Sequence, residues 1–248
     1  GSPRSSYDFF ESRVAGYVVE RPKSLQYGMN FRSDSRKKLS ISGRFKRTLR
    51  PAWDYSENSF NLTGRIRIGE RAEISQRVDV RERKNNRGYV TRFFNDQGSL
   101  TNVVFGVRDR RTLTTTTDAR YIFSNRMGIT FRLRHNWDRV EYSNFLELTE
   151  ADELVNLDYT GRDATTNDPL HNRNFNAFNI DMEYNWQFSP GSEIRAIWKR
   201  SIGTNDFNTS LDFFDNFSNT VGAPNFDTIT IRLVYFIDYL NVRNLFRK

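Results

Sequence analysis

Two adjoining stretches of this sequence alternate residue by residue between two kinds of side chain, and this pattern restricts the fold more than any other feature. In residues 113–123 the odd positions carry mainly apolar side chains and Thr, whereas the even positions are mostly Thr, Asp and Arg. After residues 124–126 the alternation restarts and runs through residues 127–137. Successive side chains of a β-strand point to opposite faces, so the two stretches predict long strands joined by a tight turn.

The same alternation recurs along most of the chain, which predicts an all-β fold. Further alternating stretches are residues 25–31, 39–45, 60–68, 72–80, 178–188, 194–198 and 229–239. The connections alternate in length: short turns are predicted at 34–36, 69–71, 124–126 and 189–191, and long loops at 48–57, 84–101, 149–173 and 202–226. Outer-membrane barrels have short periplasmic turns and long extracellular loops, so this alternation in length favours such a barrel.

We therefore predict an antiparallel transmembrane β-barrel of about ten to twelve strands, either complete or the C-terminal part of a larger barrel. The strands reach the roughly 9–11 residues that a tilted strand needs to cross a bilayer. Residues 24–248 are assigned to the barrel strands and their extracellular loops, and residues 1–23 to a lead-in with room for one short strand. A soluble all-β binding domain, with its apolar face turned into a core, is the alternative.

Composition excludes a helical membrane protein. Only 37% of the residues are hydrophobic, the mean hydropathy is −0.73, and no apolar run approaches the length of a membrane-spanning helix. The chain has no cysteine, so disulfide frameworks and thiolate metal sites are ruled out. The segment that begins at Gly1 lacks the apolar run of a secretory signal peptide, so we expect a mature, truncated or partial chain.

The two faces of the strands predict two sets of functional side chains. We expect the polar face to line a basic-leaning lumen that suits an anionic or sugar-like solute, with ion-pair ladders that fill the interior as the alternative. The basic candidates are Arg65, Arg67, Arg77, Arg81, Arg120, Arg132, Arg134, Arg195, Lys199 and Arg232. We expect the apolar face to meet outer-membrane lipid through an aromatic girdle. The girdle candidates are Tyr121, Phe123, Trp137, Tyr184, Trp186, Phe188, Trp198, Tyr235 and Tyr239.

No catalytic or metal-binding pattern emerges, and we predict neither enzyme activity nor a cofactor. The two histidines, His135 and His171, stand in no recognisable spacing to a Ser nucleophile and a carboxylate. The acidic loop 147–168 lacks regular calcium-ligand spacing. The net charge of +8 comes from residues spread along the strands, and not from one basic block, so we expect no nucleic-acid partner.

Several stretches resemble one outer-membrane family. They are FRSDSRKKL at 31–39, NRGYV at 86–90, FGVRDRRT at 105–112, FRLRH at 131–135 and LVYFIDYL at 233–240. Members of this family, found in Bacteroidota, combine an N-terminal domain similar to carbohydrate-binding module family nine with a β-barrel of unknown function. The resemblance covers residues 24–248 and implies the C-terminal barrel part, without the sugar-binding-like domain and with no catalytic residues to carry over.

These observations predict a protein of the bacterial outer membrane that serves as a pore- or transport-type scaffold, or as a barrel subunit of an assembly with other outer-membrane or periplasmic subunits. One alternative is an interaction protein whose filled barrel anchors the loops or a separate N-terminal glycan-binding-like domain. The soluble binding domain, and an outer-membrane hydrolase that uses His135, are further alternatives, because a fold alone does not determine function.

Overall fold

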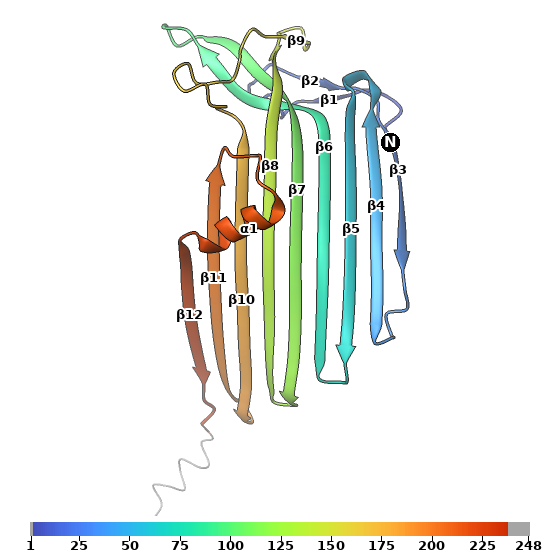
Figure 1. Cartoon of the computed structure of the whole chain (residues 1–248), viewed down its shortest axis with the longest axis vertical. Helices are drawn as coiled ribbons and strands as arrows, with labels where there is room; N and C mark the ends of the chain where they lie inside the picture. Colours follow the sequence, from blue (N-terminus) through green and yellow to red (C-terminus); the bar gives the residue numbers. More distant parts are fainter. Residues whose placement is uncertain (1, 238–248) are drawn as a thin grey trace, which may run out of the picture.

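A computed structural model of the chain describes residues 2–237. Ten strands form one antiparallel sheet in the order β12-β11-β10-β8-β7-β6-β5-β4-β3, with the short strand β9 paired to β8 (Figure 1). Their bounds are β3 (Leu25–Arg32), β4 (Leu39–Arg50), β5 (Tyr55–Ile68), β6 (Ala72–Phe94), β7 (Leu100–Ser124), β8 (Met127–Leu148), β9 (Leu154–Asn156), β10 (Arg173–Ser189), β11 (Ser192–Asp206) and β12 (Asn225–Val234). The predicted all-β antiparallel class is confirmed.

The register between strands carries the alternation across the whole sheet. Leu113 lies opposite Trp137, and Tyr121 lies opposite Ile129. Ile129 lies opposite Tyr184 on its other side. Paired residues point to the same side of a sheet, so the apolar positions of neighbouring strands share one face and the charged positions share the other. We refer to these as the apolar face and the polar face.

The two ends of the sheet differ. Tight turns join β5 to β6, β7 to β8 and β10 to β11 at the lower end in Figure 1, which we call the turn end. The opposite end, the loop end, carries the longer connections and the N-terminal segment (Figure 1). At the loop end β6 and β7 rise beyond their neighbours and bend over the rest of the sheet. The register shifts at this end lie in the upper parts of β6, β7 and β8.

The sheet is curved but open, and this corrects the prediction of a closed barrel for the described residues. The pairing path begins at β12 and ends at β3, and no described strand joins these two edges. Both edge strands expose nearly all of their side chains. Closure needs a pairing between the first and last strands. The period-two pattern within each strand does not encode that pairing.

Two of the four predicted long loops are wrong. Most of residues 48–57 is strand, because β4 and β5 are separated only by a short 3-10 turn, η1 (Pro51–Trp53), and Asp54. Residues 84–101 are also largely strand, since β6 continues to Phe94 and β7 begins at Leu100. Both segments carry polar side chains on both faces, so they show no alternation. The predicted loops 149–173 and 202–226 contain the two longest connections between strands of the sheet.

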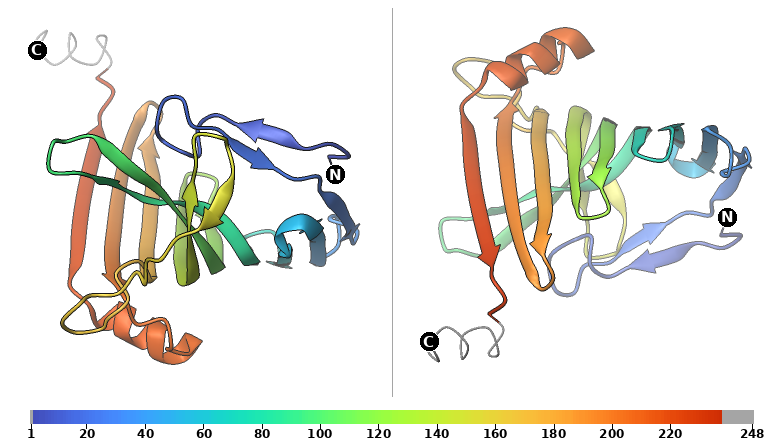
Figure 2. Two further views of the ribbon diagram at one scale, coloured as in Figure 1. Left: turned by 90° about the horizontal axis from the view of Figure 1, so that it is seen from above. Right: turned by 90° about the horizontal axis from the view of Figure 1, so that it is seen from below.

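The N-terminal lead-in holds two short strands, where the sequence indicated one. β1 (Ser6–Asp8) pairs antiparallel with β2 (Val19–Arg21) in a separate small sheet. Val19 packs into a compact apolar cluster from the upper ends of β7 and β8, formed with Val103, Phe105, Leu146 and Leu148. The N-terminal segment thus covers part of the loop end, on the opposite side of the sheet from helix α1 (Figure 2).

Helix α1 (Phe213–Gly222), within the predicted loop 202–226, lies on the apolar face near the loop end (Figures 1 and 2). Its first turn is capped by Asp212, whose carboxylate accepts a hydrogen bond from the backbone N–H of Asp215 at 2.9 Å. The rings of Phe213 and Phe217 lie 6.0 and 5.2 Å from the ring of His135. The helix therefore covers the upper border of the apolar face.

The described residues include no helix that is both long and apolar enough to cross a membrane.

Asn216 anchors α1 to the sheet through buried amides. Its Nδ2 donates to Asn176 Oδ1 at 2.7 Å, while its Oδ1 accepts from the amides of Asn176 and Asn174 at 3.0 and 3.2 Å. We expect Asn216→Ala to destabilise the docked helix by about 1–3 kcal/mol, because it leaves buried amides without partners. Hydrogen exchange of the α1 amides would measure the loss. Asn219→Ala, on the exposed side of the same helix, is the control, and equal effects of the two variants would contradict this role.

Candidate functional site

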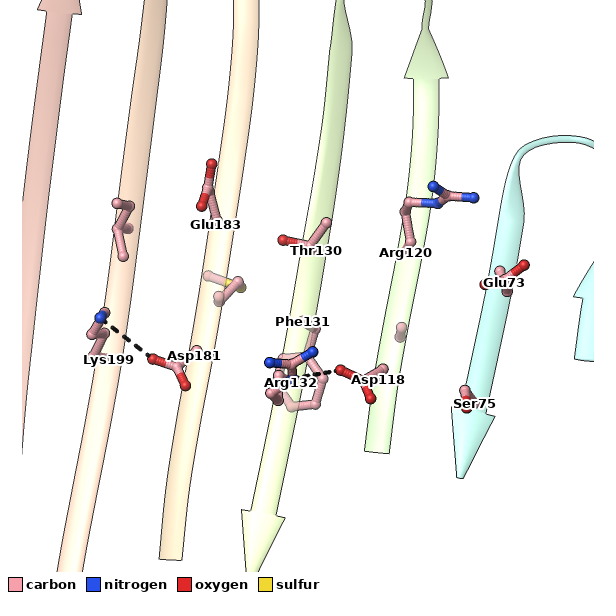
Figure 3. Close-up of a pocket in the computed structure, with 13 residues that line it drawn as sticks. Glu73, Ser75, Asp118, Arg120, Thr130, Phe131, Arg132, Asp181, Glu183 and Lys199 are labelled. Carbon is pink, nitrogen blue, oxygen red and sulfur yellow. Dashed lines mark hydrogen bonds and ion pairs between the residues drawn. The ribbon is translucent and has the colours of Figure 1, made fainter. Parts of the chain in front are cut away.

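The polar face carries a row of charges that alternate in sign from strand to strand. The register places Asp118 of β7 opposite Arg132 of β8, Arg132 opposite Asp181 of β10, and Asp181 opposite Lys199 of β11. Arg132 Nε lies 2.6 Å from Asp118 Oδ1, and Lys199 Nζ lies 3.8 Å from Asp181 Oδ1 (Figure 3). Opposite charges across neighbouring strands stabilise the pairing that brings them together.

A second row lies closer to the turn end. Glu73 of β6 stands between Arg67 of β5 and Arg120 of β7 in the register. Arg67 Nε lies 3.2 Å from Glu73 Oε2. Between the two rows the polar face forms a hollow of about 590 Å³, lined by four carboxylates and three cationic side chains (Figure 3). The net charge of this part of the polar face is close to zero, in contrast to the predicted excess of basic side chains.

The register brings all ten predicted basic residues onto the polar face. Seven of them lie within 4.0 Å of a carboxylate: Arg65, Arg67, Arg77, Arg81, Arg132, Arg195 and Lys199. The other three, Arg120, Arg134 and Arg232, form no such pair among the described residues. Since most of the pairs are partly exposed, each contributes little to stability, about 0–1 kcal/mol. Of the ten candidates, these three arginines are therefore the ones without a carboxylate partner in the described part of the chain.

The predicted girdle residues divide into two groups. Near the turn end, Tyr121 and Phe123 pack edge to face at 4.8 Å, and Phe188 stacks on Tyr235 at 6.2 Å. Trp186 joins them beside Phe188, while Tyr184 lies one position further up the same face. These side chains line one border of the apolar face.

The remaining girdle candidates lie elsewhere. Trp137 was predicted as a girdle residue, but the structure places it in the interior. It is buried and contacts Phe213 of α1, and its indole N–H donates to Asn174 at 2.7 Å. Trp198 lies further up the apolar face, with its indole N–H bonded to Asp227 at 2.9 Å. Tyr239 lies outside the described residues. Trp137 looked like a girdle residue because the helix that covers it follows 76 positions later in the sequence.

Between the aromatic border and the loop end, the apolar face forms a continuous band without charge. On β6 its side chains run from Ala72 to Val80, and the next position on that face is Glu82. Glu82 lies 3.2 Å from Arg111, the residue that follows the band on β7. At the β12 edge the upper border is the ion pair of Arg200 with Asp227, at 2.8 Å. The band thus matches the roughly 9–11 residues of a membrane-crossing strand.

Neither histidine forms part of a nucleophile and base arrangement in the described residues. His135 is buried beneath α1, with its Nε2 3.1 Å from Asn176 Oδ1. His171 lies in the connection before β10, with its Nε2 2.7 Å from the hydroxyl of Tyr159, and burial lowers its pKa. Within residues 2–237, no group of three or more His, Asp or Glu side chains is placed to hold a metal ion.

One cluster escaped the sequence analysis. Arginines from β4, β6 and β7 gather with two N-terminal arginines in a pocket at the loop end. One of these residues, Arg87, lies within the range 84–101 that was assigned to a loop, and Arg83 directly precedes that range. The density of arginine between residues 81 and 111 was the available signal, but it lacks any spacing that would indicate a pocket.

The fold and its two faces define an all-β protein whose ten-stranded antiparallel sheet separates an apolar band from a charged surface. Comparison with protein families matches residues 1–246 to the family described as domain of unknown function DUF5916. The match covers nearly the whole chain, so the protein belongs to this family. Searches of curated proteins and of solved structures found no match.

Proposed function

We propose that this chain is an outer-membrane β-barrel protein of a bacterium, acting as a pore- or transport-type scaffold or as a barrel subunit of an outer-membrane assembly. One observation carries the proposal: the uncharged apolar band crosses the whole sheet and is backed by a charged face. An outward apolar band and a polar interior are the two surfaces of a transmembrane barrel. Lipid is then the partner of the band, and an aqueous solute is the partner of the polar face.

The exposure of the band supports lipid over water as its surroundings. Met29, Ile229 and Ile231 expose 66%, 73% and 71% of their surfaces, although they lie on regular strands, the edge strands β3 and β12. Soluble monomers rarely expose contiguous apolar patches larger than a few hundred Å². Covering such a band with lipid gains about 25 cal/mol for each Å² removed from water. A soluble binding domain would instead need a second layer over the band, and among the described residues only α1 covers any of it.

The open edges set a further requirement for the proposal. An unpaired strand edge is costly in lipid, where each free backbone N–H and C=O lacks water as a partner. Strands outside the described sheet must therefore pair with β3 and β12. A wider barrel of a longer protein or a partner subunit would supply them. The resemblance to the C-terminal part of an outer-membrane barrel favours the first source.

A filled barrel that serves as an anchor is the second candidate, and the charge rows favour it. The alternating signs of Asp118, Arg132, Asp181 and Lys199 neutralise one another, as expected of side chains that fill an interior. Such a barrel would hold its loops, or a separate N-terminal glycan-binding-like domain, at the cell surface.

Electrical recording from planar bilayers that contain the native full-length protein distinguishes the candidates. A pore predicts discrete current steps with a preference for anions, because Arg120 and Arg134 lack carboxylate partners among the described residues. The double variant Arg120→Glu with Arg134→Glu should lower that preference. Arg111→Glu, on the opposite face of β7, should leave it unchanged. Folded protein in the bilayer without current would favour the anchor, and failure to enter the bilayer would contradict both.

A further inference from the structure

The loop end of the polar face holds a pocket that differs in charge from the rows below it. The pocket has a volume of about 400 Å³ and lies where the N-terminal segment meets β4, β5, β6 and β7. Seven arginine side chains line it, against two glutamates. The hollow between the two charge rows, by comparison, is lined by four carboxylates and three cations. The pocket is therefore strongly cationic, whereas the hollow is close to neutral.

Four of the seven arginines have polar partners in the fold. Arg83 lies 2.8 Å from Glu57, Arg21 lies 2.6 Å from Asp8, and Arg110 lies 2.7 Å from Asp138. Arg108 donates to the hydroxyl of Tyr142 at 2.8 Å and to the Oδ1 of Asn86 at 3.2 Å. Of these four, three are neutralised by carboxylates and the fourth is held only by neutral groups.

The other three arginines have no carboxylate partner among residues 2–237. Each lies over an aromatic ring instead: Arg13 over Tyr89 at 4.9 Å, Arg50 over Tyr55 at 4.7 Å, and Arg87 over Trp53 at 5.1 Å. A ring holds a guanidinium in place through its face and leaves the edge of the guanidinium free to donate hydrogen bonds. The three cations are thus positioned but not neutralised.

Among the three arginines, Arg87 is the one that would gain most from a bound anion. Its Nε is buried and has no hydrogen-bond partner within residues 2–237. Close beside it, the side chain of Arg108 approaches Gly88, where a Cβ would clash with the guanidinium. A half-buried cation without a carboxylate partner is destabilising, and so is the crowding of several like charges. A bound anion would relieve both.

We propose that this pocket binds a small multivalent anion that carries phosphate or carboxylate groups. Guanidinium groups match these anions through paired, charge-assisted hydrogen bonds. The pocket opens on the polar face and not on the apolar band, so the anion comes from solution and not from a lipid headgroup. This site goes beyond the proposed function, because its contacts do not depend on closure of the sheet or on the presence of lipid.

Titration of the folded full-length protein with pyrophosphate and with citrate, followed by calorimetry, tests the site. We expect saturable binding that weakens with added salt. Arg87→Gln and Arg50→Gln should each raise the dissociation constant about tenfold or more, since each removes charge-assisted hydrogen bonds. Arg92→Gln is the matched control: Arg92 also lies over a ring, that of Phe94 at 5.4 Å, but it is outside the pocket. Its dissociation constant should stay within about twofold of the wild type.

Three results would overturn the proposal. They are the absence of saturable binding by the wild type, equal losses in Arg87→Gln and Arg92→Gln, and displacement of pyrophosphate by phosphatidylglycerol vesicles, which would assign the site to a lipid. Circular dichroism and thermal melting check that each variant is folded. If Arg87→Gln does not fold, Arg50→Gln still tests the site independently. Anion binding without current in bilayers would contradict only the proposal that the protein is a pore. Current without anion binding would contradict only the proposed anion site.

Discussion

Replacing Asp138 by alanine is expected to lower the free energy of unfolding by about 2–4 kcal/mol. Asp138 is buried on the polar face of β8 and accepts hydrogen bonds from Arg110 at 2.7 Å, Arg173 at 2.6 Å and Thr112 at 2.8 Å. Its removal leaves two guanidinium groups without a carboxylate. Both arginines are partly exposed and can turn toward water, which keeps the expected loss below that of a fully buried pair.

The control for Asp138 is Asp118, on the neighbouring strand of the same face. Asp118 pairs with Arg132 at 2.6 Å, but both side chains are about half exposed. Exposed pairs contribute about 0–1 kcal/mol, so Asp118→Ala should change the free energy of unfolding by no more than that. Denaturant titration of both variants in the same detergent measures the difference. Equal losses would show that burial does not decide the strength of these ion pairs.

Phe131→Arg is expected to destabilise the lipid-embedded protein by about 2–4 kcal/mol, the cost of an arginine near the middle of the bilayer. Phe131 lies in the middle of the apolar band on β8, opposite Ala119 and Met182. Thr130→Arg, one residue earlier, places the same side chain on the polar face, between Glu183 of β10 and Arg120 of β7. The neighbouring carboxylate and water should limit that cost to about 1 kcal/mol.

Urea titration of both arginine variants in phospholipid vesicles compares the two faces on one strand. A larger loss for Phe131→Arg than for Thr130→Arg supports lipid contact of the apolar band. Equal losses, or a larger loss for Thr130→Arg, would mean that the apolar band does not face lipid. The wild type should not fold in aqueous buffer without lipid or detergent. A cooperative urea transition under those conditions would show that the protein is a soluble domain.

The lower half of the sheet could be predicted from the sequence because each strand there has one apolar and one charged face. Alternation with period two reports directly on such a strand, and it located the strands on both sides of residues 69–71 and 124–126. Above the band the same strands continue with polar side chains on both faces. Residues 84–94 therefore looked like a loop although they complete β6.

Features that depend on distant contacts were not predictable. Helix α1 had local signals, an N-cap at Asp212 and the spacing of Phe213 and Phe217, but they were hidden in a segment predicted as loop. The burial of Trp137 depends on that helix. The arginine pocket draws its arginines from the N-terminal segment and from β4, β6 and β7, and only the folded sheet brings them together.

The most direct test of the central claim is a spin-label scan along β8 in lipid vesicles. The chain contains no cysteine, so each introduced cysteine carries the only label. Labels at residues 127–134 should alternate: odd positions should respond to oxygen dissolved in the lipid, and even positions to a water-soluble nickel complex. Water accessibility at every position, or an alternation of opposite phase, would contradict an apolar face that meets lipid and a polar face that meets water.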